Sequence, residues 1–221
     1  MRRRILIGTM LLTAWLGGAQ PSWSQGTIAY YQPSTPIPLW IPPDSFDIAR
    51  QLPFSFDESS TRDLTFAYGW VFIGVRSEGN TRLLTWMSPP PNIGGDPAPL
   101  PFGFEIGDSS SSGSLQWFGD DVDVFERLIH CVDTGCGGAF RGQHAYMGVE
   151  FQRAGATHYG WILLEISDHT ASGSIEAWAW ETRPGVPILA GVVPEPSTWA
   201  LLIGGGVVIV WFRGKRNERR G

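Results

Sequence analysis

Three segments in the second half of the chain carry the pattern of hydrophobic and polar residues that is typical of β-strands. Residues 146–152 alternate between the two types, and residues 175–182 place Trp178 and Trp180 on one face and alanines on the other. Residues 159–166 are almost continuously hydrophobic. Because short segments separate the three, we expect them to form an antiparallel meander.

The first half of the chain contains one long hydrophobic stretch. Residues 64–75 place aromatic side chains on one face, which predicts a single strand whose second half is buried on both faces. The turn-forming run at residues 77–80 separates this stretch from residues 82–87, so the two are expected to pair as a hairpin. Trp70 and Trp161 are expected to lie in the core.

Proline- and glycine-rich segments separate these strands. The chain contains 17 prolines and 28 glycines and shows no long helical periodicity. Residues 89–101 and 108–114 predict surface loops. Residues 115–118 predict a short strand, whereas residues 122–129 fit either a strand or one to two helical turns. These features favour an all-β domain.

The two ends of the chain have the pattern of sorting signals. Residues 1–24 combine three arginines, a short hydrophobic run and a small, polar exit, which predicts a signal peptide that is cut before Gln25, with Ala19 as a second possible site. Residues 199–212 are uncharged and mostly hydrophobic. As a helix they would reach about 21 Å against a hydrocarbon core of roughly 30 Å, which is short for a permanent transmembrane helix.

A proline-containing boundary and a basic cluster enclose this short C-terminal helix. Pro194, Glu195 and Pro196 precede the helix and prevent it from extending upstream. A basic cluster follows it and is expected to stop translocation at the inner membrane. The cluster consists of Arg213, Lys215, Arg216, Arg219 and Arg220.

Residues 194–221 resemble the PEP-CTERM sorting signal of proteins exported by Gram-negative bacteria. The resemblance rests on the Pro-Glu-Pro motif, a short glycine-containing helix and a terminal basic cluster in that order. It implies export, transient anchoring in the inner membrane, and processing near the motif by an exosortase, followed by release to the cell surface or the exterior. Residues 147–188 also resemble the final region of many such proteins. This implies that residues 25–193 form an extracellular, antiparallel β-sandwich of the jelly-roll type.

The charge of the expected body differs from that of the whole chain. Residues 25–193 contain eight arginines, no lysine and nineteen acidic residues, which gives a net charge of −11. This charge disfavours binding to nucleic acid or to anionic lipid and suits a solvated extracellular domain.

The two cysteines of the chain, Cys131 and Cys136, are five positions apart in a glycine-rich segment. In an oxidising compartment they are expected to form a disulfide bond. The alternative is a zinc site, for which His130 and His144 would have to supply the remaining ligands.

Acidic residues suggest two further kinds of site. Asp120, Asp121 and Asp123 supply oxygen ligands of the kind that calcium prefers, but their spacing is not that of an EF-hand loop, so a solvated acidic turn is the simpler interpretation. Glu150 and Glu165 lie within expected strands, as does Glu176, and could provide a glycosidase carboxylate pair. The sequence shows no nucleophile elbow or phosphate-binding loop, and we expect neither an enzyme nor a cofactor.

Tryptophans give the remaining hypothesis. If Trp178 and Trp180 face solvent beside Glu176, they could stack on sugar rings. We therefore expect a structural or adhesive component of the exopolysaccharide matrix, with a carbohydrate-binding module as the alternative and a glycoside hydrolase as the third possibility. The expected partners are the exosortase, the inner membrane and extracellular polysaccharide.

Overall fold

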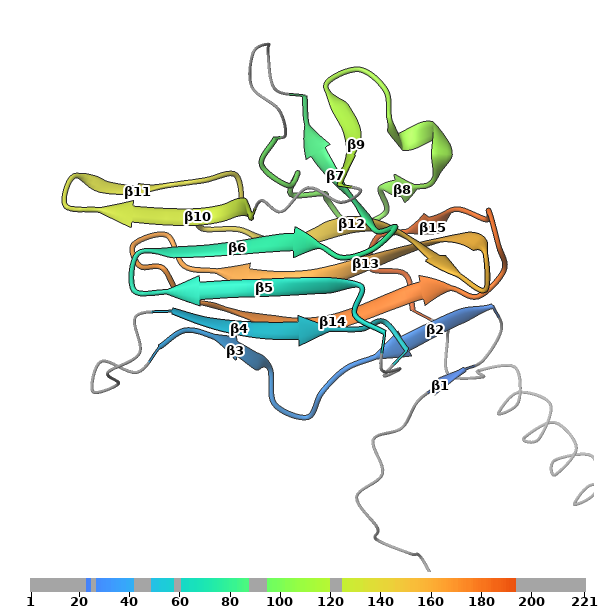
Figure 1. The fold of residues 1–221 in the computed structure, drawn as a ribbon, viewed down its shortest axis with the longest axis horizontal. Coiled ribbons are helices and arrows are strands. Elements are labelled where there is room, and N and C mark those ends of the chain that lie inside the picture. The colour runs from blue at the N-terminus through green and yellow to red at the C-terminus, as the bar shows by residue number, and fades with distance from the viewer. Residues whose placement is uncertain are drawn as a thin grey trace, which may run out of the picture.

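The computed structural model describes residues 23–24, 27–41, 49–57, 61–87, 95–119 and 125–193, and these residues form an all-β, antiparallel structure (Figure 1). Most of the expected signal peptide and all of residues 194–221, including the expected helix at 199–212, lie outside the described residues. Among the residues described, no helix is long and hydrophobic enough to cross a membrane.

Eight strands form the larger sheet, in the order β1-β2-β14-β13-β12-β7-β9, with β3 also pairing with β14. These strands are β1 (Trp23–Ser24), β2 (Ile28–Tyr31), β3 (Ile37–Leu39), β7 (Arg82–Trp86), β9 (Leu115–Gly119), β12 (His144–Arg153), β13 (Ala156–Ile166) and β14 (Gly173–Glu181). Because β1 belongs to the expected signal peptide, cleavage before Gln25 would remove it and leave β2 at the sheet edge.

Five strands form the smaller sheet, in the order β11-β10-β6-β5-β4. These strands are β4 (Ala49–Phe54), β5 (Leu64–Gly69), β6 (Phe72–Ser77), β10 (Glu126–Val132) and β11 (Gly135–Gly137). Two short strands, β8 (Glu105–Ile106) and β15 (Ile188–Leu189), pair separately, and a 3-10 turn, Asp108–Ser110, follows β8. Pro53 lies in β4, an edge strand, which is where the missing N–H of a proline is tolerated in a sheet.

The predicted C-terminal meander is confirmed. β12 pairs with β13 from His144↔Glu165 to Arg153↔Ala156, and β13 pairs with β14. Gly160 of β13 lies in close contact with the neighbouring strand and with the inner core. A Cβ at Gly160 would lie 2.8 Å from the Ala179 carbonyl oxygen and 2.8 Å from the Phe56 ring, so this position requires glycine.

The two sheets share one hydrophobic core. The smaller sheet contributes Phe66 and Ile73, and the larger sheet contributes Met147 and Phe151, all of them fully buried. Phe56, which follows β4, stacks on Phe151 with ring centroids 4.7 Å apart. The odd-numbered hydrophobic positions of β12 therefore face this inner core, as their alternation predicts.

A second hydrophobic cluster covers the other face of the larger sheet. Trp161 is 1 % exposed there and contributes to a cluster that includes Ile106 of β8 and Ile188 of β15. The burial of Trp161 in the core is thus confirmed. β13 is covered on both faces, and this also explains its nearly unbroken hydrophobicity.

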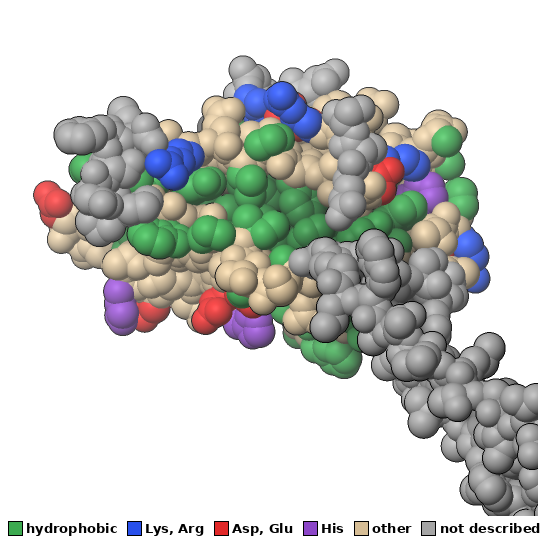
Figure 2. All heavy atoms as spheres, turned by 90° about the horizontal axis from the view of Figure 1, so that it is seen from below, with side chains coloured by type: hydrophobic (Ala, Val, Ile, Leu, Met, Phe, Trp, Pro, Cys, Tyr) green, Lys and Arg blue, Asp and Glu red, His purple; other side chains and the backbone are tan. Residues whose placement is uncertain are grey.

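Hydrophobic side chains gather along one edge of the two-sheet body. Figure 2 looks at the edge formed by β4 and by β2 and β3, and shows hydrophobic side chains forming a band along the molecule. Tyr31, Ile37 and Leu52 are partly buried against the inner core. These residues lie on the edge strands of the two sheets.

The structure corrects the interpretation of residues 64–75 as a single strand. They form two strands, β5 and β6, which pair in an antiparallel hairpin with Trp70 and Val71 in the turn. Trp70 was expected in the core but is 56 % exposed. The continuous hydrophobic pattern concealed the turn, because turn residues are usually recognised by polar, glycine or proline composition.

The hairpin predicted between residues 64–75 and 82–87 is also wrong. β6 pairs with β5 and β10 in the smaller sheet, whereas β7 pairs with β12 and β9 in the larger one. Residues 77–80 therefore carry the chain from one sheet to the other. The ambiguity at residues 122–129 resolves to a strand, β10, for the part that the structure describes.

The Phe56–Phe151 stack should contribute strongly to stability. Phe56→Ala is expected to lower the free energy of unfolding by about 3–5 kcal/mol, because it removes a fully buried ring and leaves a cavity. Phe102→Ala is the matched control, since Phe102 is 71 % exposed and its loss should cost about 0.5 kcal/mol or less. Urea unfolding measures both. Equal effects would contradict the placement of Phe56.

Candidate functional site

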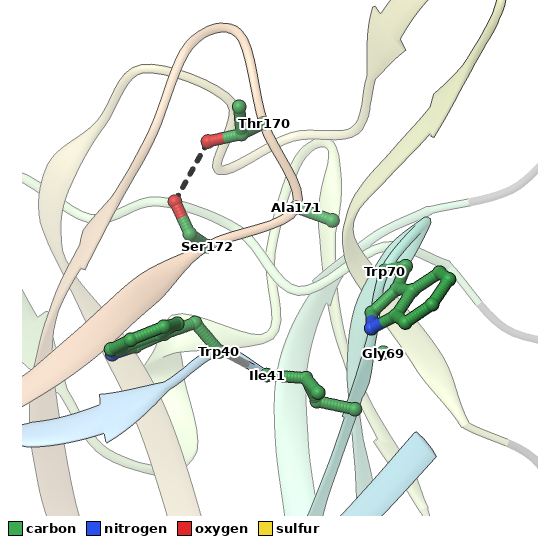
Figure 3. Close-up of a pocket in the computed structure, with 7 residues that line it drawn as sticks. All are labelled: Trp40, Ile41, Gly69, Trp70, Thr170, Ala171 and Ser172. Carbon is green, nitrogen blue, oxygen red and sulfur yellow. Dashed lines mark hydrogen bonds between the residues drawn. The ribbon is translucent and has the colours of Figure 1, made fainter. Parts of the chain in front are cut away.

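Two exposed tryptophans lie at one end of the two-sheet body. Trp40 follows β3 and is 44 % exposed, and Trp70 lies in the β5–β6 turn. Both line a hollow of about 440 Å³ together with Ile41, Thr170 and Ser172 (Figure 3). Figure 3 shows the Trp70 indole on one side of this hollow and the Trp40 indole on the other, with Ile41 between them.

Local backbone structure explains why these indoles face outward. Leu39 and Ile41 are buried, so the alternation of an extended chain turns Trp40 between them to the outside. Trp70 occupies a tight turn whose flanking residues Tyr68 and Ile73 make the last pair of the hairpin. Among the residues that the structure describes, the two indoles remain 44 % and 56 % exposed.

A second hollow adjoins the first and shares Trp40 and Ser172 with it. It has a volume of about 530 Å³ and is also lined by Glu165, Ser167 and Ser174. We call the residues lining the two hollows the two-tryptophan surface. It combines two aromatic faces with several hydroxyl groups and the exposed carboxylate of Glu165.

The loop between β13 and β14 supplies most of these hydroxyl groups. Within it the Ser167 hydroxyl accepts hydrogen bonds from the backbone N–H groups of His169 and Thr170, at 3.2 and 3.3 Å. The hydroxyl groups of Thr170 and Ser172 lie 2.8 Å apart. The loop is therefore held by its own short side chains.

Arg141 connects this loop to the hairpin that carries the disulfide. Its guanidinium donates to the Asp168 carbonyl at 2.9 Å and to the Cys136 carbonyl at 3.0 Å. It also forms an ion pair with the Asp168 carboxylate at 2.6 Å. One arginine thus fixes the position of the β13–β14 loop relative to β11.

The tryptophans predicted as a sugar platform are not together on an exposed face. Trp178 is 9 % exposed and packs in the inner core, stacked on Tyr31 with centroids 5.6 Å apart. Trp180 is half-buried against the rings of Phe151 and His158. β14 is covered on both faces, so Ala177, Trp178 and Ala179 are buried and Trp180 is half-buried. Glu176 is half-buried and accepts a hydrogen bond from the Ser174 hydroxyl.

Of the carboxylates considered for glycosidase chemistry, Glu176 lies two residues beyond Ser174, the partner of Glu165 on the neighbouring strand, whereas Glu150 lies far from Glu165. Glu150 pairs across β12–β13 with Tyr159, whereas Glu165 pairs with His144, six positions further along β12. At about 3.4 Å per residue these rows lie roughly 20 Å apart, well beyond the ~5–10 Å that either glycosidase mechanism uses. Glu150 is buried and forms an ion pair with Arg82.

The predicted disulfide is present. Cys131 and Cys136 face each other directly across the β10–β11 hairpin and are bonded, so their sulfurs are not available for the zinc alternative. Among the described residues, no group of three or more histidine, cysteine or acidic side chains could hold a metal. The calcium candidates Asp120, Asp121 and Asp123 lie outside the described part of the chain.

Comparison with known proteins yields no relative: no protein-family model, no curated protein and no solved structure matches this chain.

Glu126, at the start of β10, has a carboxyl group with an unusually high pKa. Burial, and to a smaller extent the nearby Asp96, raise the pKa of its carboxyl group to about 7, while Arg127 opposes the shift. A carboxyl group with such a pKa often marks a catalytic acid. However, Glu126 lines neither hollow of the two-tryptophan surface.

The raised pKa of Glu126 predicts a pH-dependent stability. The folded protein binds this proton more tightly than the unfolded chain, so the free energy of unfolding falls as the pH rises from 4.5 to about 7. Glu126→Gln should therefore be more stable than the parent protein above pH 7 and should lose this advantage below pH 4.5. Urea unfolding across this range tests the effect, with the exposed Glu105→Gln as the charge control. A stability difference that does not vary with pH would contradict it.

Proposed function

We propose that this chain is an exported component of the extracellular polysaccharide matrix, and that its body binds polysaccharide through the two-tryptophan surface. The observation that supports the proposal most is the exposure of Trp40 and Trp70 at one end of the body, on hollows lined by hydroxyl groups. This moves the carbohydrate hypothesis away from Trp178 and Trp180. Under this proposal the protein is an adhesive matrix component because it binds carbohydrate, so the first two interpretations of the sequence describe one role.

The chemistry of the surface suits a sugar ligand. The face of an indole attracts the weakly positive C–H groups of a sugar ring, while hydroxyl and carboxylate groups exchange hydrogen bonds with its hydroxyls. Thr170, Ser172 and Glu165 supply such groups beside the two tryptophans. This combination of apolar faces with a few polar groups is typical of small-molecule sites.

The charge of the body narrows the class of polysaccharide. Residues 25–193 carry a net charge of −11, and the exposed Glu165 adds negative charge at the surface itself. The positive charge of the neighbouring Arg141 is paired with Asp168. A polyanionic polysaccharide would be repelled, so we propose a neutral one.

The route to the matrix is proposed from the two ends of the chain. The signal peptide at residues 1–24 would direct export, and the PEP-CTERM-like segment would hold the protein in the inner membrane until an exosortase processes it. The disulfide between Cys131 and Cys136 supports an oxidising destination. We also propose the finer fold assignment, a β-sandwich of the jelly-roll type, which is supported by the four crossings of the chain between the two sheets.

Polysaccharide binding should depend on each exposed tryptophan. Trp40→Ala and Trp70→Ala are each expected to weaken the binding of the exported protein to its neutral polysaccharide about tenfold, which corresponds to ~1.4 kcal/mol. Trp86→Ala is the matched control, because Trp86 is 43 % exposed but lines neither hollow. Affinity electrophoresis in gels containing polysaccharide measures the effect. If all three variants migrate like the parent protein, the surface is not the binding site. Release of reducing sugar from the polysaccharide would instead support the hydrolase alternative.

Processing should depend on the proline motif. Replacing Pro194, Glu195 and Pro196 with alanines should leave export intact but retain the full-length protein in the inner membrane, because the rigid, non-helical recognition segment is lost. Cell fractionation and immunoblotting in the native host measure retention. A variant that is processed and released at the normal rate would show that the motif is only a linker.

A further inference from the structure

A small hydrophobic surface lies where the described chain ends. Phe102, Leu189 and Val193 are 71 %, 42 % and 37 % exposed. We call these three residues the exit surface, because Val193 directly precedes the Pro-Glu-Pro motif.

Backbone hydrogen bonds hold the exit surface together. The Gly103 N–H donates to the Ala190 carbonyl at 2.9 Å, and the Ala190 N–H donates to the Phe104 carbonyl at 2.9 Å. The Phe102 ring lies over Gly191, where a Cβ would come within 2.6 Å of it. Phe102, the most exposed phenyl ring of the described body, therefore packs over Gly191, which is two residues before Val193 in the sequence.

The sequence around the exit surface contains few charges, although the exposed Glu105 pairs directly with Leu189 across β8 and β15. Residues 97–104 and 184–194 lack acidic and basic side chains altogether, although residues 25–193 contain nineteen acidic residues. An acidic protein is repelled by the anionic headgroups of a bilayer. The surface around Phe102 and Val193 can therefore approach a membrane with less of that cost, which remains for the Glu105 carboxylate on the strand paired with Leu189.

Chain length places the exit surface close to the bilayer. Five residues separate Val193 from Trp199, the first residue of the expected helix, and the six Cα–Cα steps between the two span at most about 20 Å. While that helix is inserted, the exit surface is tethered within this distance of the membrane. Exposed hydrophobic side chains at such a position gain free energy by entering the headgroup region.

We propose that the exit surface rests on the lipid headgroups of the outer leaflet of the inner membrane while the protein is anchored, and that it leaves the membrane on processing. This inference rests on the proposed function of the C-terminal segment. Its consequence is a defined orientation of the body before release, with Phe102 as the principal contact. The partner is lipid, which an experiment can separate from the exosortase.

The test uses the unprocessed full chain in lipid nanodiscs that contain no exosortase. Because the described residues include no free cysteine and the sequence has no cysteine besides the bonded pair, a single introduced cysteine can carry a nitroxide spin label. Leu189→Cys places the label on the exit surface and leaves Phe102 intact. Val132→Cys is the matched control, because Val132 is 61 % exposed and lies on β10 of the smaller sheet.

The accessibility of each label to a water-soluble nickel relaxation agent distinguishes the outcomes. At position 189 it should be several-fold lower in nanodiscs than in the processed, released protein, and Phe102→Ser should reverse most of the protection. At position 132 it should not change. If the chain associates with the nanodisc but position 189 remains as accessible as in the released protein, the exit surface does not contact lipid and the inference fails. If the chain does not associate with the nanodisc, the proposed membrane anchoring fails as well, and both are overturned.

Discussion

The burial of the larger sheet on both of its faces is the constraint on which the rest of the structure depends. β13 lies at the centre of that sheet, with the inner core on one side and the cluster around Trp161 on the other. Gly160 allows the strand, its neighbour and the Phe56 ring to meet without a side chain between them. Because side chains of the central strands are enclosed on both faces, groups that contact a ligand must come from turns and strand ends. The two-tryptophan surface consists largely of such positions.

Sequence reasoning recovered the parts of the fold in which the local pattern and the tertiary environment agree. The alternation in β12 and the hydrophobic run in β13 predicted both strands and their pairing, and the cysteine spacing predicted the disulfide. Residues 64–75 show where it failed. Their hydrophobic pattern continues through a tight turn, and the register that would have revealed the turn depends on pairing with β4 and β10, which no local window contains.

The same limitation explains why the site residues were missed. Trp70 and Trp178 occupy similarly hydrophobic segments, yet one lies in a turn and the other in a central strand. Trp178 is buried because neighbouring elements cover β14, and the local sequence does not reveal this difference from Trp70. Trp40 offered a better signal, because it stands in a proline-rich segment shortly before Pro42 and Pro43, where an exposed side chain is expected. The contribution of Thr170 and Ser172 follows from the folding of the β13–β14 loop, which Arg141 positions from a distant part of the chain.

Nuclear magnetic resonance of the indole N–H groups tests the central claim, polysaccharide binding at the two-tryptophan surface, most directly. Residues 25–193 contain seven tryptophans, whose indole signals can be assigned one by one by substitution. Titration of the ¹⁵N-labelled exported protein with neutral polysaccharide fragments should shift or broaden the signals of Trp40 and Trp70, and should leave those of the buried Trp161 and Trp178 in place. If the signals of Trp40 and Trp70 stay unchanged while the polysaccharide binds, the account of this surface is contradicted.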